Sequence, residues 1–148
     1  MNLNYKKVIY RFINYMLIVF VSSNLIAKQL AVTFDDLPYS RDVNISELAD
    51  NTNKILEALA KYNIHTIGFV NEKNLYLDNS ELRIEVLEQW LKFGHTLGNH
   101  TYSHASFHKV SLDEFKDEVI KGEYVTRTLM NKYNQKLKYF RYPYSHAE

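Results

Sequence analysis

Short apolar segments rich in β-branched residues alternate with helical patterns along this chain, and this alternation restricts its fold more than any other feature. Strands are predicted at residues 30–34, 66–70, 96–99 and 139–142, with a helical pattern between each consecutive pair. A strand-helix unit of roughly 30 residues is typical of parallel strands joined by right-handed crossovers. The chain is therefore predicted to be an α/β protein, either a barrel or an open doubly wound sheet.

Two of the helical patterns have clear end signals. Apolar residues recur at helical spacing through residues 45–60, and Asn44 with Glu47 three positions later is a plausible capping pair. A second helix is predicted at residues 82–91, where Gly94 can end it. These signals indicate where the chain leaves each helix to form the next strand.

The third helical pattern is longer and has a weak point. Ser111 and Glu114 form a capping signal, and apolar residues then follow helical spacing as far as Tyr133. Gly122 stands in the middle of this pattern, where glycine costs helix stability. The sequence predicts one helix over this segment, weakened at its centre.

The N-terminus has the layout of a secretory signal peptide. It begins with three basic residues, Lys6, Lys7 and Arg11. An apolar stretch at residues 12–21 follows, and small residues come after it. Residues 1–27 are predicted to be a signal peptide, with an uncleaved membrane anchor as the alternative, because the apolar stretch is short for a spanning helix. Residues 28–148 would then be exported to the periplasm or the cell exterior, or face outward from a membrane.

Length and composition set further limits. A complete barrel of this type takes roughly 250 residues, so this 148-residue chain is expected to be the N-terminal part of a longer protein. The alternative is a small complete α/β domain. The net charge of +1 argues against a nucleic-acid partner, and the absence of cysteine excludes a disulfide framework and thiolate metal ligands.

Polar residues gather just after three of the predicted strands. Asp35 and Asp36 follow the first strand, His100 and His104 follow the third, and residues 141–144 lie at the fourth. Active sites of parallel α/β folds form at the carboxyl ends of the strands. Residues far apart in sequence are therefore expected to share one face.

The spacing of His100 and His104 suits a shared metal ion. Four residues of separation places both imidazoles on one side of a helical turn, and one carboxylate would complete a two-histidine, one-carboxylate set. Catalytic zinc and the iron(II) of oxygenases both use such a set. Taken alone, the histidines could also be solvated or capping residues, and Asp35 with Asp36 could be a turn or capping pair.

The segment at the fourth strand offers two further functions. Arg141 can pair with a carboxylate and so orient a base. Pro143 stiffens the following turn, and Tyr144 has a backbone amide that could point at a developing oxyanion. Without the other clusters, Tyr142 and Tyr144 would be read as core or interfacial aromatics.

Three segments together resemble the first motifs of the polysaccharide deacetylases, the NodB-like carbohydrate esterases of family four. They are Thr-Phe-Asp-Asp at 33–36, His-Thr-Tyr-Ser-His at 100–104 and Arg-Tyr-Pro-Tyr at 141–144. The resemblance covers residues 30–144 and implies a distorted (β/α) barrel. One departure is Ser145, where the family commonly has glycine. The family's remaining motifs, which supply a histidine general acid, would lie beyond Glu148.

The resemblance also implies functions for individual residues. The metal ligands would be Asp36, His100 and His104. Asp35 would be the general base, Arg141 would orient it, and the Tyr144 amide would bind the oxyanion. The ion would be divalent, with Zn²⁺ favoured over Co²⁺ or Ni²⁺, and the substrate an N-acetylated, N-acetylglucosamine-type polysaccharide or an O-acetylated one. The alternative is a noncatalytic glycan-binding or remnant protein on the same scaffold.

Overall fold

The computed structural model describes residues 30–39 and 44–145. The chain divides into two compact units, Met1–Leu30 and Ala31–Glu148, and the second unit is the one described below. The predicted signal segment at residues 1–27 lies outside the described residues. Within the described part of the chain, no helix has the length and apolar character needed to cross a bilayer.

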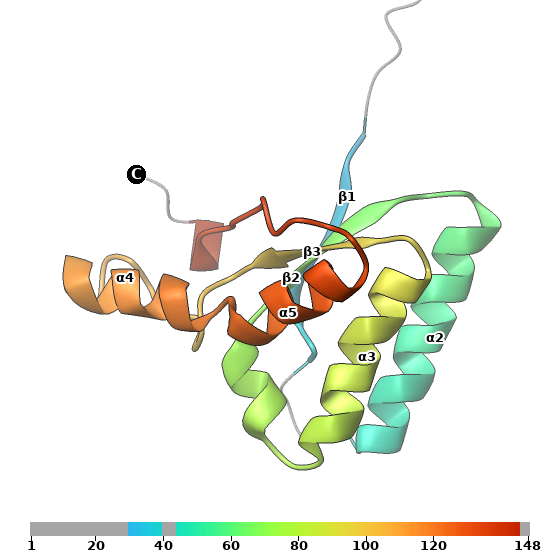
Figure 1. Cartoon of the computed structure of the whole chain (residues 1–148), viewed down its shortest axis with the longest axis horizontal. Coiled ribbons are helices and arrows are strands. Elements are labelled where there is room, and N and C mark those ends of the chain that lie inside the picture. The colour runs from blue at the N-terminus through green and yellow to red at the C-terminus, as the bar shows by residue number, and fades with distance from the viewer. Residues whose placement is uncertain (1–29, 40–43, 146–148) are drawn as a thin grey trace, which may run out of the picture. The chain divides into compact units, whose positions relative to one another are not determined.

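A parallel three-stranded sheet forms the centre of the second unit (Figure 1). Strands β1 (Val32–Leu37), β2 (Thr66–Val70) and β3 (Thr96–Asn99) lie in the order β1-β2-β3. Both strand pairs are parallel, so all three carboxyl ends lie at the same edge. The predictions for β2 and β3 are confirmed to the residue, and the α/β class is confirmed with them.

The first strand begins and ends later than predicted. The prediction placed it at residues 30–34, whereas Leu30 is exposed and pairing starts at Val32. The strand continues through Asp35 and Asp36 because Leu37 pairs with Val70 after a break in register. The two carboxylates therefore lie within the irregular end of the strand and not in a loop after it.

Helices α2 (Ile45–Lys61) and α3 (Ser80–Lys92) lie side by side next to the sheet (Figure 1). The Asn44 side chain accepts a hydrogen bond from the backbone N–H of Ser46, which confirms it as the N-cap of α2. Gly94 has φ 81°, a left-handed conformation suited to glycine just after a helix. It follows the C-cap of α3, as predicted.

Both helices bury apolar side chains against the sheet and against each other. Trp90 is 1% exposed, and its ring meets that of Phe34 edge to face with centroids 5.1 Å apart. Among the described residues, ten form the buried core cluster: Leu56, Leu59, Val70, Leu75, Leu87, Trp90, Leu91, Leu97, Leu129 and Met130. This core fixes β1, which carries the carboxylates, relative to β2 and β3.

The prediction of one continuous helix from residue 111 to residue 133 is wrong, because the chain forms α4 (Leu112–Lys121) and then α5 (Tyr124–Lys132). Ser111 and Glu114 make the predicted capping box at the start of α4. The break falls at Gly122, whose backbone packs closely against residues 101–102. A Cβ atom at Gly122 would lie 2.6 Å from the carbonyl carbon of Thr101 and 2.7 Å from the amide nitrogen of Tyr102.

The start of α5 is capped by a residue from another element. The 3-10 helix η1 (Glu72–Tyr76) follows β2 and was not predicted. Its fully buried Glu72 accepts hydrogen bonds from the backbone N–H groups of Val125 (3.1 Å) and Thr126 (2.6 Å). Two amides that have no partner within the first turn of α5 are thereby satisfied.

The predicted fourth strand at residues 139–142 is a single β-bridge between Phe140 and Asn99. Tyr139 accepts from the Asn99 N–H, and the Arg141 N–H donates to the Asn99 carbonyl. The pairing stops after this bridge because the Thr101 N–H bonds to the side chain of Asn99, and the Arg141 carbonyl faces Nδ1 of His100. The pairing nevertheless fixes Arg141 beside the carboxyl end of β3.

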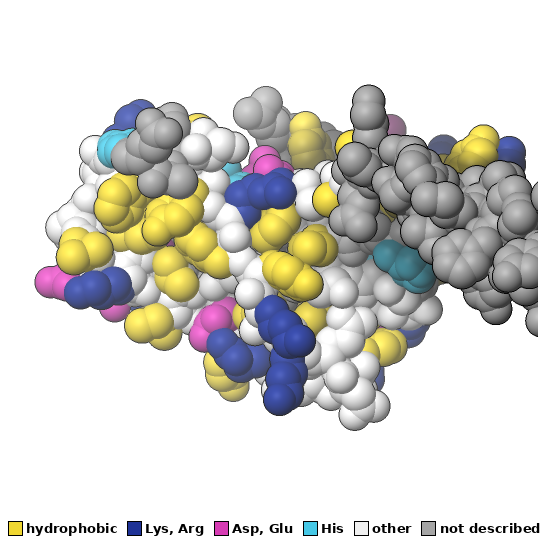
Figure 2. Space-filling model, turned by 90° about the horizontal axis from the view of Figure 1, so that it is seen from above, with side chains coloured by type: hydrophobic (Ala, Val, Ile, Leu, Met, Phe, Trp, Pro, Cys, Tyr) yellow, Lys and Arg dark blue, Asp and Glu magenta, His cyan; other side chains and the backbone are white. Residues whose placement is uncertain are grey.

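An apolar groove of about 440 Å³ lies between α4 and the Phe140–Tyr142 segment. Figure 2 shows hydrophobic side chains gathered on the side of the molecule where α4 lies. Leu112 is 59% exposed and Ile120 is 66% exposed. The groove is lined by Phe107, Leu112, Phe115, Lys116, Val119, Ile120, Phe140 and Tyr142.

Candidate metal centre

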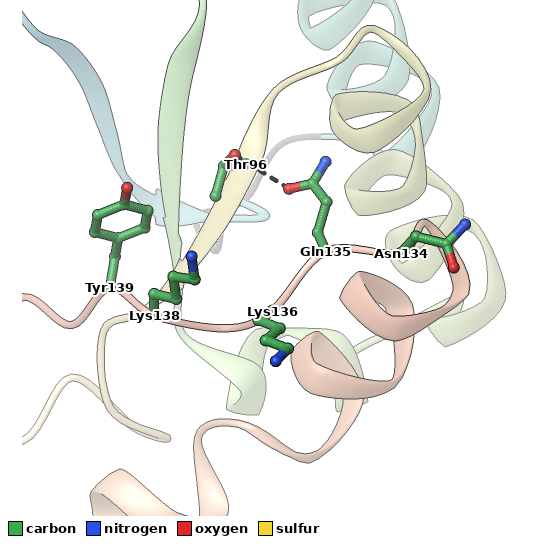
Figure 3. Close-up of a pocket in the computed structure, with 6 residues that line it drawn as sticks. All are labelled: Thr96, Asn134, Gln135, Lys136, Lys138 and Tyr139. Carbon is green, nitrogen blue, oxygen red and sulfur yellow. Dashed lines mark hydrogen bonds between the residues drawn. The ribbon is translucent and has the colours of Figure 1, made fainter.

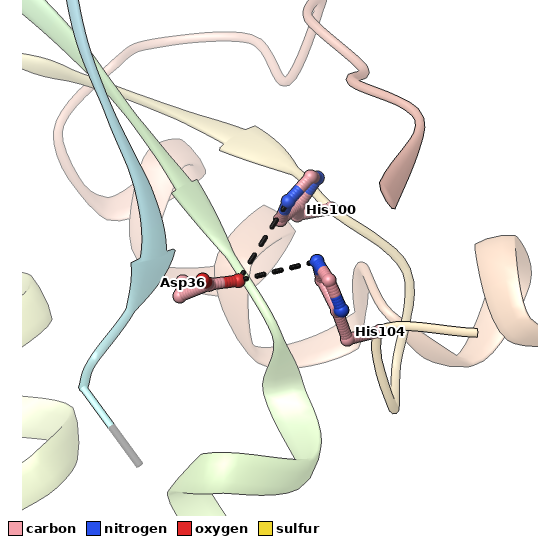
Figure 4. A group of neighbouring side chains, drawn as sticks. All are labelled: Asp36, His100 and His104. Carbon is pink, nitrogen blue, oxygen red and sulfur yellow. Dashed lines mark ion pairs between the residues drawn. The ribbon is translucent and has the colours of Figure 1, made fainter. Parts of the chain in front are cut away.

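Asp36, His100 and His104 converge at the carboxyl end of the sheet (Figure 4). The Asp36 Oδ1 atom lies 3.7 Å from Nε2 of His100 and 3.5 Å from Nε2 of His104. One ligand atom from each residue lies within 4.8 Å of the other two. The three predicted metal ligands are therefore close together, although 64 sequence positions separate the aspartate from the first histidine.

The geometry fits a divalent ion better than a hydrogen-bonded cluster. Distances of 3.5 and 3.7 Å are too long for good hydrogen bonds. Two atoms bound to one zinc ion at its usual distance lie about 3.3 Å apart in a tetrahedral arrangement. The Asp36 side chain is 49% exposed, yet its Oδ1 atom is buried without a hydrogen-bond partner. A cation between these atoms would satisfy that oxygen.

The backbone at the ligands adopts an unusual conformation. Asp36 (φ 61°), Thr101 (φ 66°) and His104 (φ 61°) are in the left-handed region, which residues other than glycine seldom occupy. At Asp36, this conformation coincides with the break in register at the end of β1. The turn moves the Asp36 carboxylate toward the histidines, and strain of this kind is common at functional sites.

A backbone carbonyl sets the orientation of the His100 ring. His100 Nδ1 lies 2.8 Å from the carbonyl oxygen of Arg141, so Nδ1 carries the proton and Nε2 is left with a lone pair facing Asp36. Burial lowers the pKa of His100, while the Arg141 carbonyl and the Asp35 charge act in the opposite direction. The net effect favours the neutral imidazole, which is the form that binds a metal.

Arg141 also binds the carboxylate predicted to be the base. Its Nη1 atom lies 2.6 Å from Oδ1 of Asp35 and donates to Oγ1 of Thr33 at 2.8 Å. The guanidinium stacks over the ring of Phe69, with its central carbon 4.2 Å from the ring centroid. The predicted Arg141–Asp35 pair is present, and Thr33 and Phe69 position its arginine.

Several residues support the loop from His100 to His104, here called the histidine loop, and the sequence predicted no function for them. Asn71 donates from its side chain to the carbonyl of His100 at 2.6 Å, and the Asn99 side chain accepts from the Thr101 N–H at 2.7 Å. Glu118 of α4 accepts from the Tyr102 N–H through its carbonyl and from the Ser103 N–H through its carboxylate. Asn71 directly follows β2, and Asn99 is the last residue of β3. Their positions at the carboxyl ends of strands could have identified them as residues of the site.

The predicted oxyanion residue lies next to His104, one of the predicted metal ligands. The ring centroid of Tyr144 is 4.6 Å from that of His104. Tyr144 (φ 61°) and Ser145 (φ 57°) are both left-handed within the short helix η2 (Pro143–Ser145). Glycine adopts this left-handed conformation without steric cost. The resemblance leads us to expect glycine at position 145, where this chain has serine.

A cleft of about 510 Å³ opens at the metal centre. Most of its lining is polar, and it also includes two tyrosines. The residues are Asp36, Tyr39, Asn71, Lys73, Asn74, Ser103, His104 and Tyr144. A polar, aromatic-edged cleft beside a metal centre suits a ligand with many hydroxyl groups.

A second hollow, of about 420 Å³, lies around the first residue of β3 and so at the opposite end of the sheet (Figure 3). Thr96 donates to the side chain of Gln135 there at 3.1 Å. Lys136 and Lys138 are its charged lining residues, and no histidine or carboxylate is among those that line it. This hollow lacks the groups that the chemistry at the metal centre would need.

The fold and site define a parallel α/β protein in which two histidines and one carboxylate could hold a metal ion beside an arginine-held aspartate. The family model described as polysaccharide deacetylase matches residues 22–148. The chain therefore belongs to the polysaccharide deacetylase family, whose NodB-like barrel it forms in part.

Named relatives agree with this assignment. A peptidoglycan-N-acetylglucosamine deacetylase from Bacillus cereus is 34% identical over 101 residues, covering 68% of this chain and 32% of that protein. A chitin deacetylase from Arthroderma benhamiae is 37% identical over 82 residues, or 55% of this chain and 19% of that protein. The chain thus spans a third or less of the curated relatives it matches.

The fold also matches solved structures. A CE4 family pseudoenzyme from Bacillus anthracis superposes with a TM-score of 0.59 at 20% identity, over 80% of this chain and 36% of that one. This likeness concerns the fold alone. Because a pseudoenzyme shares the fold, activity has to be argued from the residues of the site.

Proposed function

We propose that the protein containing this chain removes acetyl groups from N-acetylated polysaccharide of the N-acetylglucosamine type. The observation that carries the proposal is the convergence of Asp36, His100 and His104 beside the Asp35–Arg141 pair. The names of the peptidoglycan and chitin deacetylase relatives support the substrate class. O-acetylated glycans remain a second substrate class, because these groups would act on an acyl centre.

The residues of the site would divide the work between them. Asp36, His100 and His104 would hold a divalent ion, for which we propose Zn²⁺, with Co²⁺ and Ni²⁺ as alternatives. When bound, such an ion lowers the pKa of water and polarises a carbonyl group. Asp35 would take the proton from the attacking water, since Arg141 holds its carboxylate in place.

The remaining functions concern the leaving group and the developing charge. Tyr144 would donate its backbone amide to the oxyanion of the tetrahedral intermediate. Expulsion of the amine needs a proton donor. Among the described residues that line the cleft, His104 is the one histidine, and it is already assigned to the metal. We propose that the donor is a histidine from a part of the protein beyond this chain.

The second candidate is a noncatalytic glycan-binding or remnant protein on the same scaffold. A site that binds the glycan without cleaving the amide would result if no group protonates the leaving amine, and among the described cleft residues His104 is the one histidine. Both candidates would be exported, a proposal supported by the basic residues and apolar stretch at the N-terminus.

Acetate release from short N-acetylglucosamine oligomers would test the proposed activity. The chain and any longer form of the protein would be assayed with and without a chelator, and with Zn²⁺ restored. Chelator-sensitive release that Zn²⁺ restores would support the deacetylase. Oligomer binding without release by any form would instead support the noncatalytic candidate.

A further inference from the structure

The 3-10 helix η1 has one buried face and one exposed face. In a 3-10 helix, residues three apart lie above one another. Glu72 and Leu75 are both buried, and they form the inner face. Lys73 and Tyr76, also three apart, form the outer face, and both are exposed. Lys73 lines the cleft at the candidate metal centre. Tyr76 lies one turn of η1 beyond Lys73 on the same face of the helix, and so next to the cleft.

A second tyrosine from the histidine loop lies beside this face. The ring centroids of Tyr76 and Tyr102 are 6.3 Å apart, with the ring planes inclined at 45°. The two segments are joined by a hydrogen bond of 2.9 Å from the Lys73 N–H to the Tyr102 carbonyl. Tyr102 precedes Ser103 and His104, which line the cleft. The ring pair therefore adjoins the cleft from both segments.

Tyr76 is the exposed member of this pair. It is 60% exposed, whereas Tyr102 is half-buried, so the ring of Tyr76 is open to a ligand. Tyrosine combines a large apolar face with a hydroxyl group and loses little conformational entropy on binding. Such a face, next to the amine of Lys73 and the amide of Asn74, matches a pyranose ring with its C–H face and rim of hydroxyl groups.

We propose that Tyr76, Tyr102 and Lys73 form an accessory subsite that binds a sugar ring of the glycan next to the one at the metal centre. This inference rests on the proposed function, because it takes the ligand of the cleft to be a glycan chain. Tyr76 supplies the stacking face, and Lys73 binds hydroxyl or acyl oxygens of the same ring. The subsite makes the protein select chains over single sugars.

Binding of N-acetylglucosamine oligomers, from the monomer to the pentamer, tests the subsite by calorimetry on the Zn²⁺-loaded chain. The unmodified chain is expected to bind longer oligomers more tightly. Tyr76→Ala should weaken binding of the longest oligomers about fivefold to tenfold and leave the monomer unchanged. Tyr76→Phe, which keeps the ring, should restore most of the affinity.

Tyr62→Ala is the matched control, since Tyr62 is 69% exposed and lies at the end of α2 that leads into the amino end of β2. Equal length dependence in the unmodified chain and in Tyr76→Ala would overturn the subsite. Equal losses in Tyr62→Ala and Tyr76→Ala would overturn it as well. If one of these results overturned the subsite while acetate release persisted, the proposed function would still stand. Failure of the subsite can therefore be distinguished from failure of the proposed function.

Discussion

His100 Nδ1 lies 2.8 Å from the backbone carbonyl oxygen of Arg141, while the guanidinium of the same arginine lies 2.6 Å from the Asp35 carboxylate. One residue therefore orients a proposed metal ligand through its backbone and the proposed base through its side chain. Its position depends in turn on the bridge between Phe140 and Asn99. The relative placement of ligand and base is thus fixed by a single short segment.

The ligand assignment predicts a loss of metal binding in single variants. His100→Ala and His104→Ala should each weaken Zn²⁺ binding by on the order of 100-fold or more, because each removes one of three protein ligands. Titration of Zn²⁺ followed by calorimetry measures the change. His65→Ala, which removes an exposed histidine outside the cluster, is the control. Unchanged affinity in both ligand variants would refute the assignment.

Gly122→Ala is predicted to affect the metal centre from a distance. The added methyl group would meet the backbone of Thr101 and Tyr102 in the histidine loop. We expect a loss of about 1–3 kcal/mol in the free energy of unfolding, together with weaker Zn²⁺ binding. Urea denaturation and Zn²⁺ titration measure the two effects.

Gly94→Ala serves as the control for Gly122→Ala. It strains a left-handed position, but the nearest atom to its new methyl group would be 3.9 Å away, on His65. Stability should therefore fall while Zn²⁺ affinity stays the same. If Gly122→Ala lowered stability without changing Zn²⁺ affinity, the coupling between α4 and the histidine loop would be disproved.

Glu72 is predicted to make stability depend on pH. Burial raises the pKa of Glu72 above its ordinary value of 4.5, and the N–H groups of Thr126 and Val125 offset this in part. The folded chain therefore holds this proton more tightly than the unfolded chain. The contribution of Glu72 to stability should be greatest below pH 4.5 and should fall as the pH rises from there through the raised folded pKa.

Urea denaturation across the acidic to neutral range would measure this effect. The difference in unfolding free energy between the unmodified chain and Glu72→Gln isolates the residue, since the other titrating groups are common to both. Glu85→Gln removes an exposed glutamate on α3 and should leave the pH profile unchanged. A pH-independent difference for Glu72→Gln would count against the prediction.

Ser145 is predicted to be replaceable by glycine with a gain in stability. Its φ of 57° costs a residue with a Cβ atom about 1 kcal/mol, part of which is offset by the greater freedom of glycine in the unfolded chain. Ser145→Gly should raise the free energy of unfolding by up to about 1 kcal/mol, and Ser145→Val should lower it. Thermal denaturation would reveal the order, and a stabilising valine would contradict it.

The apolar groove beside α4 is predicted to cause self-association. Replacing Ile120 with glutamate and Leu112 with lysine would place charges on two of its most exposed residues. Sedimentation at several concentrations should show less association in this double variant. Leu77→Lys, at an exposed apolar residue that does not line the groove, should change little. Equal association in all three proteins would exclude the groove as the cause.

Much of this protein could be predicted from local sequence. The limits of β2 and β3, the capping box of Ser111 and Glu114, and the left-handed turn at Gly94 follow from side-chain pattern and backbone preference. The convergence of Asp36, His100 and His104 and the Arg141–Asp35 pair were also predicted, because parallel strands bring residues at their carboxyl ends to one edge.

The tertiary structure decided what depends on packing between distant segments. The end of β1 extends through the carboxylates because Leu37 pairs with Val70, and the helix breaks at Gly122 because the histidine loop packs there. The residues at 139–142 form one bridge because the Thr101 N–H and the Arg141 carbonyl, which would continue the pairing, contact the side chains of Asn99 and His100 instead. Local preference specifies the conformation of a segment, whereas the ligand geometry depends on contacts between atoms that the sequence keeps far apart.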